Sequence, residues 1–166
     1  MKRLLLDTNI YGELVVDADI NKLHDSLVSP KNIVIFGVKI IRQELRATPK
    51  KIKVDGSNLR IDMLNLYDFL VKERTINLNK EIESLAQSYY ATYREFGGSW
   101  GFKEMQNDLL IVATAAIKQM DIVVSNDEAT MQSEQALRTY NLVNAIRQLK
   151  NPQFIDYKEF KKLMLR

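Results

Sequence analysis

The chain contains no cysteine and only one histidine, His24, and these absences remove several kinds of chemistry. Without cysteine there is no disulfide framework, no thiolate zinc site and no thiol nucleophile. A single histidine leaves little material for imidazole catalysis or for a histidine-based metal site. Any catalysis by this chain must therefore rely on carboxylates.

Long hydrophobic runs are also missing. The most apolar stretch, residues 109–117, is far shorter than the roughly 20 residues that span a bilayer, and residues 1–6 lack the hydrophobic core of a signal peptide. We therefore expect a soluble, cytoplasmic protein that does not contact a membrane. A length of 166 residues, with 46% hydrophobic and 27% charged residues, predicts one folded domain over residues 1–166.

The net charge of +3 is small, but it is unevenly distributed. Residues 42–60 and residues 147–166 each contain six basic and two acidic residues, whereas the rest of the chain is acidic. Lysine and arginine attract phosphate groups without regard to sequence, so the two basic segments are suited to a polyanion such as RNA. On composition alone, solvated helix faces explain them equally well.

Short apolar runs alternate with amphipathic stretches, which predicts an α/β domain with a central, mostly parallel sheet. We expect strands at residues 3–6, 33–36 and 122–124, and short extended segments at 75–78 and 154–155. A turn is expected at 29–32, and the helical region from 14 to 27 is expected to break near 17–19. Further helices are expected at 38–45, 59–70, 81–96, 109–120 and 134–150, followed by a basic terminal helix.

Two of the apolar runs are followed closely by carboxylates: Asp7 comes directly after Leu6, and Asp127 comes three residues after Val124. The carboxyl ends of parallel strands meet at one edge of a sheet, where ligands bind. A helix of about twelve residues descends about 18 Å and a five-residue strand climbs back roughly 16 Å, which places Asp108 at the level of Asp127. Taken alone, Asp108 reads as a capping residue in the first turn of its helix.

Glu44 is a fourth candidate, although its placement is less direct. A position six residues into a straight helix that starts near Val38 lies about 9 Å below the edge of the sheet, so Glu44 reaches the edge only if the helix starts later or its entry is bent. Carboxylates that share one site repel one another unless a cation lies between them. Oxygen ligands without histidine or cysteine favour Mg²⁺ or Mn²⁺ over zinc.

Four spaced motifs of this chain resemble the PIN-domain family of metal-dependent nucleases, specifically the VapC-like ribonucleases. The motifs are Leu6–Asn9, Gln43–Leu45, Asn107–Ala115 and Val123–Asp127. The third and fourth, which follow each other closely, are the most specific. The chain departs from the family after Asp127, where Ala129, Thr130 and Met131 stand in place of an aromatic residue that the family often carries.

The resemblance implies a single-domain, three-layer α/β/α PIN-like fold and hydrolysis of RNA with Mg²⁺ or Mn²⁺. It implies that the catalytic and metal-binding residues are Asp7, Glu44, Asp108 and Asp127. It also implies three supporting residues that orient these acids, namely Thr8, Asn9 and Asn126. VapC-like proteins commonly form homodimers and act as toxins that a small antitoxin protein blocks.

Basic side chains near an acidic site are needed to hold a phosphate backbone, and the candidates for RNA binding are Lys50, Lys51, Lys53 and Lys103. Two other functions remain open. A phosphoryl-transfer domain, such as a haloacid-dehalogenase-like phosphatase, also carries an aspartate after its first strand, but the Asp7–Asn9 segment lacks the second aspartate typical of that class. A non-catalytic RNA-binding or regulatory module on the same fold is the other.

Overall fold

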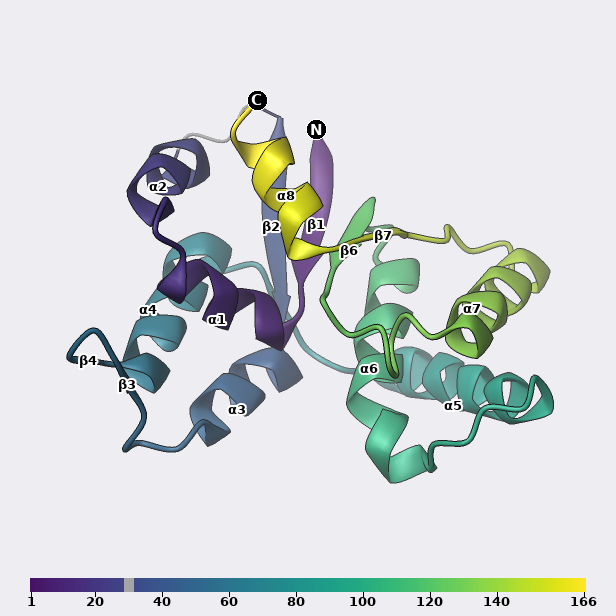
Figure 1. Cartoon of the computed structure of the whole chain (residues 1–166). Coiled ribbons are helices and arrows are strands. Elements are labelled where there is room, and N and C mark those ends of the chain that lie inside the picture. Colours follow the sequence, from purple (N-terminus) through teal and green to yellow (C-terminus); the bar gives the residue numbers. More distant parts are fainter. Residues whose placement is uncertain (29–31) are drawn as a thin grey trace.

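The computed structural model describes residues 1–28 and 32–166, and Figure 1 shows its arrangement. Within these ranges, five parallel strands form the central sheet in the order β5-β2-β1-β6-β7. The strands are β1 (Lys2–Leu6), β2 (Ile33–Val38), β5 (Thr75–Ile76), β6 (Ile122–Val124) and β7 (Gln153–Ile155). The turn predicted at residues 29–32 falls mostly on residues 29–31, which lie outside the described residues.

Helices flank the sheet. In the described part of the chain they are α1 (Thr8–Val16), α2 (Ile20–Val28), α3 (Lys39–Ala47), α4 (Leu59–Val71), α5 (Lys80–Glu95), α6 (Phe102–Ile117), α7 (Glu134–Ile146) and α8 (Tyr157–Met164). A small antiparallel hairpin, β3 (Lys53–Val54) with β4 (Ser57–Asn58), joins α3 to α4. Figure 1 shows α1 to α4 on one side of the strands and α5 to α7 on the other. The predicted α/β fold with a parallel central sheet is confirmed.

The central strand β1 explains how the carboxyl edge of the sheet is formed. Leu4, Leu5 and Leu6 are completely buried, because β1 has a parallel neighbour on each side and helices over its faces. Leu6 lies opposite Val124 of β6, and the backbone N–H of Asp7 donates to the carbonyl of Val124 at 2.9 Å. The residues that follow β1 and β6 therefore emerge side by side.

Helix α1 begins at Thr8, six residues before the predicted start of the first helical region, and the predicted bounds of α6 and α7 were also wrong. Helix α6 runs from Phe102 to Ile117, whereas residues 109–120 were predicted. Its first turns were missed because Phe102 and the buried Met105 are their only apolar residues, among exposed side chains such as Lys103 and Glu104. Helix α7 ends at Ile146 rather than at residue 150, and Gln148 has a φ of 56°, which a continuing helix does not allow. The predicted break near residues 17–19 is confirmed.

The C-terminal helix α8 is fastened to the first helices. Its capping box pairs Asp156 with the backbone of Glu159, and Glu159 with the backbone of Asp156. Asp17, directly after α1, accepts hydrogen bonds from Tyr157 Oη at 2.6 Å and from Lys161 Nζ at 2.8 Å. No helix in residues 1–28 or 32–166 has the length and apolar character required to cross a membrane.

Candidate functional site

Asp7 lies at the centre of the carboxyl edge, where β1 passes into α1. It is the N-cap of α1 and only 5% exposed, and the backbone N–H of Thr8 donates to its Oδ1 at 2.7 Å. Its Oδ2 accepts from Asn9 Nδ2 at 2.9 Å and from Ser125 Oγ at 2.7 Å. These contacts fix the orientation of a carboxylate that has almost no access to solvent.

Glu44 reaches the same edge from α3. Its Oε2 accepts from Thr8 Oγ1, and its Oε1 accepts from Asn107 Nδ2 of α6 at 2.7 Å. Helix α3 begins directly after Val38, so a later helix start does not explain how Glu44 reaches the edge. Figure 1 shows that α3 continues beyond the carboxyl ends of β1 and β2 and does not turn back beside the sheet. This direction of α3 keeps Glu44 at the edge.

Asp108 and Asp127 meet at the hydroxyl of Thr130. Thr130 Oγ1 contacts Asp108 Oδ2 at 2.5 Å and also contacts Asp127 Oδ2. Asp108 is the seventh residue of α6, so the interpretation of Asp108 as a capping residue in the first turn is wrong. Asp127 instead organises its own loop, since Oδ1 accepts from the backbone N–H groups of Ala129 at 3.1 Å and Thr130 at 2.8 Å.

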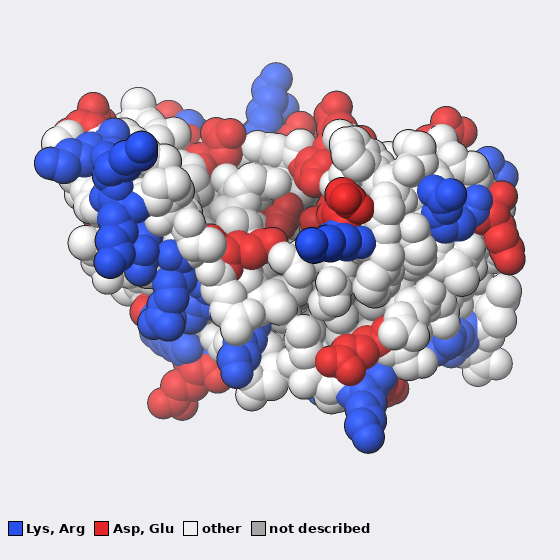
Figure 2. Space-filling view, turned by 90° about the horizontal axis from the view of Figure 1, so that it is seen from below, with Lys and Arg blue, Asp and Glu red and all other residues white. Residues whose placement is uncertain are grey.

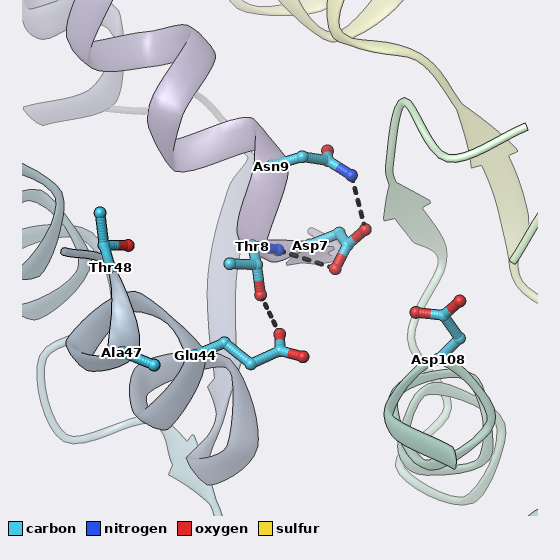
Figure 3. A pocket seen from close by; sticks show the side chains of 7 residues that line it. All are labelled: Asp7, Thr8, Asn9, Glu44, Ala47, Thr48 and Asp108. Carbon is cyan, nitrogen blue, oxygen red and sulfur yellow. Dashed lines mark hydrogen bonds between the residues drawn. The ribbon is translucent and has the colours of Figure 1, made fainter. Parts of the chain in front are cut away.

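A hollow of about 540 Å³ opens between these elements. It is lined by Asp7, Thr8, Asn9, Glu44, Ala47, Thr48 and Asp108. Figure 3 shows the carboxylates of Asp7, Glu44 and Asp108 directed toward this shared space from the end of β1, from α3 and from α6. Asp127 does not line the hollow, and it joins the group through Thr130.

Burial perturbs the two most enclosed acids. Desolvation raises the pKa of Asp7 from 3.8 to about 6, although hydrogen bonds from Ser125 and Thr8 act in the opposite direction. The charges of Glu44 and Asp127 raise it further. Four carboxylates near one another thus store electrostatic repulsion.

Asp108 is perturbed in the same way. Desolvation raises the pKa of Asp108 from 3.8 to about 7, the hydrogen bond from Thr130 lowers it, and the charges of the three other acids raise it. Strongly perturbed carboxylates in a surface hollow are a feature of functional sites.

The donor set fits a hard divalent cation. Carboxylate oxygens with hydroxyl and amide oxygens nearby, and no histidine or cysteine, are the ligands that Mg²⁺ and Mn²⁺ prefer. As the side chains stand, no group of three or more acidic or histidine residues in the described ranges is arranged to hold a metal ion. In this arrangement Glu44 accepts hydrogen bonds from Thr8 and Asn107, and Asp108 accepts one from Thr130. These hydrogen bonds hold carboxylates that repel one another.

The supporting residues named from the sequence divide into two groups. Thr8 and Asn9 donate to Glu44 and to Asp7. Asn126 contacts none of the four acids, since its backbone N–H donates to Asn9 Oδ1 at 3.2 Å. Its side chain accepts from the backbone N–H of Tyr157 at 2.9 Å and donates to Glu13 Oε1 at 3.4 Å. Asn126 therefore reaches the acids only indirectly, by holding the Asn9 amide that donates to Asp7, while its own side chain ties α8 to α1.

Three contacts of the site were missed by sequence reasoning: Ser125 on Asp7, Asn107 on Glu44, and Thr130 on Asp108 and Asp127. Ser125 is completely buried and directly follows β6, so its position after an apolar run was the available signal. Thr130 carries no such signal, because its role depends on how the loop after Asp127 folds back.

Basic side chains gather beside the acidic hollow. Figure 2 shows Lys and Arg over one side of the molecule, where Figure 1 places α3 and the β3–β4 hairpin, and Asp and Glu around the central depression. Lys50, Lys51 and Lys53 are exposed in this region, and Lys103 is exposed in the first turn of α6. None of these four lysines lines the hollow itself.

Comparisons with known proteins bear on the fold. No family model matches the chain, and no curated protein matches it. Among solved structures, a chain in the crystal structure of VapBC2 from Rickettsia felis, bound to a promoter DNA fragment, has a TM-score of 0.58 and 18% identity. That match covers 93% of this chain and 98% of the other.

A chain of VapBC-1 from nontypeable Haemophilus influenzae also has a TM-score of 0.58 and 18% identity, and the match covers 94% of this chain and 98% of that one. Likeness at this level of identity establishes a shared fold. This chain therefore has the PIN-like α/β/α fold found in the VapBC structures.

Proposed function

We propose that this protein is a Mg²⁺- or Mn²⁺-dependent ribonuclease that hydrolyses RNA phosphodiester bonds at the acidic hollow. The observation that carries the proposal is the convergence of Asp7, Glu44 and Asp108 on one hollow, from three segments far apart in the sequence. Burial and mutual repulsion disfavour three ionised carboxylates there, and a divalent cation relieves both costs.

Each residue then has a distinct part. Asp7, Glu44 and Asp108 would hold the cation, while Asp127 acts beside Asp108 through Thr130. Thr8 and Asn107 hold the Glu44 carboxylate from two sides. When bound, the cation supplies Lewis-acid chemistry, which lowers the pKa of a water and stabilises charge on the scissile phosphate. The exposed lysines beside the hollow attract the RNA backbone to a site that is otherwise acidic.

The test is cleavage of single-stranded RNA by the purified chain with Mn²⁺, with Mg²⁺, and with the metals chelated. We expect cleavage only with metal, and none by the Asp7→Asn, Asp108→Asn double variant. Cleavage by the purified double variant would refute the assigned site. Release of phosphate from small phosphomonoesters, without RNA cleavage, would favour a phosphoryl-transfer domain. RNA binding without any turnover would favour a regulatory module.

We further propose that the chain is the toxin of a VapBC-type pair, because both solved structures described above are VapBC structures. A small antitoxin would be the partner, and a homodimer is the expected assembly. Expression of the chain alone should arrest growth of the host, and the Asp7→Asn, Asp108→Asn variant should not. Normal growth and intact RNA in cells that contain soluble parent protein would contradict the toxin role and leave an RNA-processing nuclease.

A further inference from the structure

A second hollow, of about 360 Å³, lies beside the acidic one at the carboxyl edge of the sheet. It is lined by Lys39, Ile40, Gln43, Asn77 and Leu78. None of these residues takes part in the acidic site. Its volume lies within the range typical of small-ligand pockets.

The topology brings the residues of this hollow together and places them next to the acidic hollow. Val38 and Ile76 are paired across β2 and β5, so Lys39 and Asn77 leave adjacent strands at the same level. Lys39 and Gln43 are four residues apart on α3 and therefore share one face of the helix. Gln43 directly precedes Glu44, which lines the acidic hollow, so the two hollows lie on neighbouring faces of a single helical turn.

The lining has the chemistry that a nucleotide requires. The amides of Gln43 and Asn77 each offer a donor and an acceptor, and among the described residues neither side chain makes a hydrogen bond within the protein. Ile40 and Leu78 supply an apolar surface for the face of a base. Lys39 is exposed and forms no ion pair with a described residue. Its positive charge lies in the first turn of α3, where the helix dipole disfavours a cation.

We infer that this hollow is a base-recognition subsite for single-stranded RNA, in which Gln43 and Asn77 read the edge of a nucleotide next to the scissile phosphate. The inference rests on the proposed ribonuclease function. Unpaired bases present their hydrogen-bonding edges, which is how most sequence-specific proteins recognise RNA. Lys39 holds the adjoining phosphate, and the acidic hollow receives the bond to be cut.

The experiment uses a pool of single-stranded RNA of random sequence in two arms. In the first arm the parent chain cleaves the pool and the new ends are sequenced. In the second arm the Asp108→Asn variant, which is expected not to cleave, binds the pool and the bound fraction is sequenced. Gln43→Ala and Asn77→Ala are compared in both arms with Asn21→Ala, which removes an exposed amide on α2 at the other end of the molecule.

We expect one position beside the cut to show a base preference that falls about three- to tenfold in Gln43→Ala or Asn77→Ala, as for the loss of one hydrogen bond. Asn21→Ala should keep both the preference and the metal-dependent cleavage of the parent. The absence of any preference in the parent, or its persistence in both subsite variants, would overturn the subsite alone. If the parent never cleaves, the ribonuclease proposal fails, and the binding arm decides the subsite by the same criterion.

Discussion

The hydroxyl of Thr130 is the contact on which the arrangement of Asp108 and Asp127 depends. A hydroxyl has one proton and can donate to only one of the two carboxylates at a time, so Thr130 is a positioning residue between them. Val has the same shape without the hydroxyl. We expect Thr130→Val to lower Mn²⁺ affinity and kcat by about 10- to 100-fold, the range for lost partners of metal ligands.

Thr130→Ser keeps the hydroxyl and should restore most of both quantities. The melting temperature of each variant, measured without metal, separates positioning from folding. Should Thr130→Val keep the Mn²⁺ affinity and the kcat of the parent, the bridge between the two carboxylates has no functional role.

Asp108 makes a second test possible at the residue scale. Its pKa is raised to about 7 by burial, so ionised Asp108 disfavours the folded state at neutral pH and above. We expect Asp108→Asn without metal to melt at or above the temperature of the parent in a buffer near pH 7.5. The same variant should lose the thermal stabilisation that Mn²⁺ gives the parent.

The matched control is Glu128→Gln, which removes a negative charge from an exposed side chain beside Asp127. It should keep the stabilisation by Mn²⁺. Equal loss in both variants would mean that Mn²⁺ responds to general charge and does not bind at a defined site.

At the scale of elements, the docking of α8 has a predicted dependence on pH. Burial raises the pKa of Asp17, but hydrogen bonds from Lys161 and Tyr157 outweigh it and hold this pKa below the usual 3.8. A depressed pKa in the folded state stabilises the fold above pH 3.8 and loses that contribution as the pH falls through the folded-state value. We therefore expect the difference in unfolding free energy between the parent and Asp17→Asn to shrink below about pH 4.

Denaturant titrations from pH 7 to pH 3 measure this difference. Asp25→Asn is the control, because Asp25 is exposed on α2 and shows no hydrogen bond to α8 in the described residues. A difference that stays constant over this range would contradict the proposed anchor between Asp17 and α8.

The elements that the sequence predicted well are those whose pattern is set by burial. β1 and β6 were recognisable because parallel strands covered on both faces are continuously apolar. The start of α6 was missed because only Phe102 and Met105 continue its buried face into the first turns, where the other residues are polar. The same difficulty affected the placement of Glu44, since the direction in which α3 leaves β2 is decided by packing between elements.

At the scale of the whole molecule, the two basic segments, residues 42–60 and 147–166, lie in different parts of the structure. Residues 42–60 cover most of α3 and the β3–β4 hairpin beside the acidic hollow. Helix α8, which carries three of the six basic residues of the second segment, lies near the chain termini at the other end (Figure 1). Only the first segment lies beside the acids, where the proposed RNA substrate would bind. The small net charge of +3 therefore conceals a local basic surface.

This difference leads to a prediction for RNA binding. Neutralising Lys50, Lys51 and Lys53 to Gln should weaken single-stranded RNA binding and reduce the slope of log K against log salt by up to about 2, since each phosphate contact contributes about 0.7. The same triple change at Lys158, Lys162 and Arg166 of the C-terminal segment should leave the slope unchanged. Binding isotherms at several salt concentrations measure both. Equal slopes for the two triple variants would contradict the assigned RNA surface.

The central claim is that carboxylates from separate segments form one divalent-metal site at the carboxyl edge of the sheet. The most direct measurement is an anomalous difference map from crystals of the chain soaked in Mn²⁺. The account predicts a Mn²⁺ peak between Asp7 and Asp108, within reach of Glu44, and no such peak in crystals of Asp108→Asn. An empty hollow at a Mn²⁺ concentration that supports RNA cleavage in solution, or a peak elsewhere on the molecule, would contradict it.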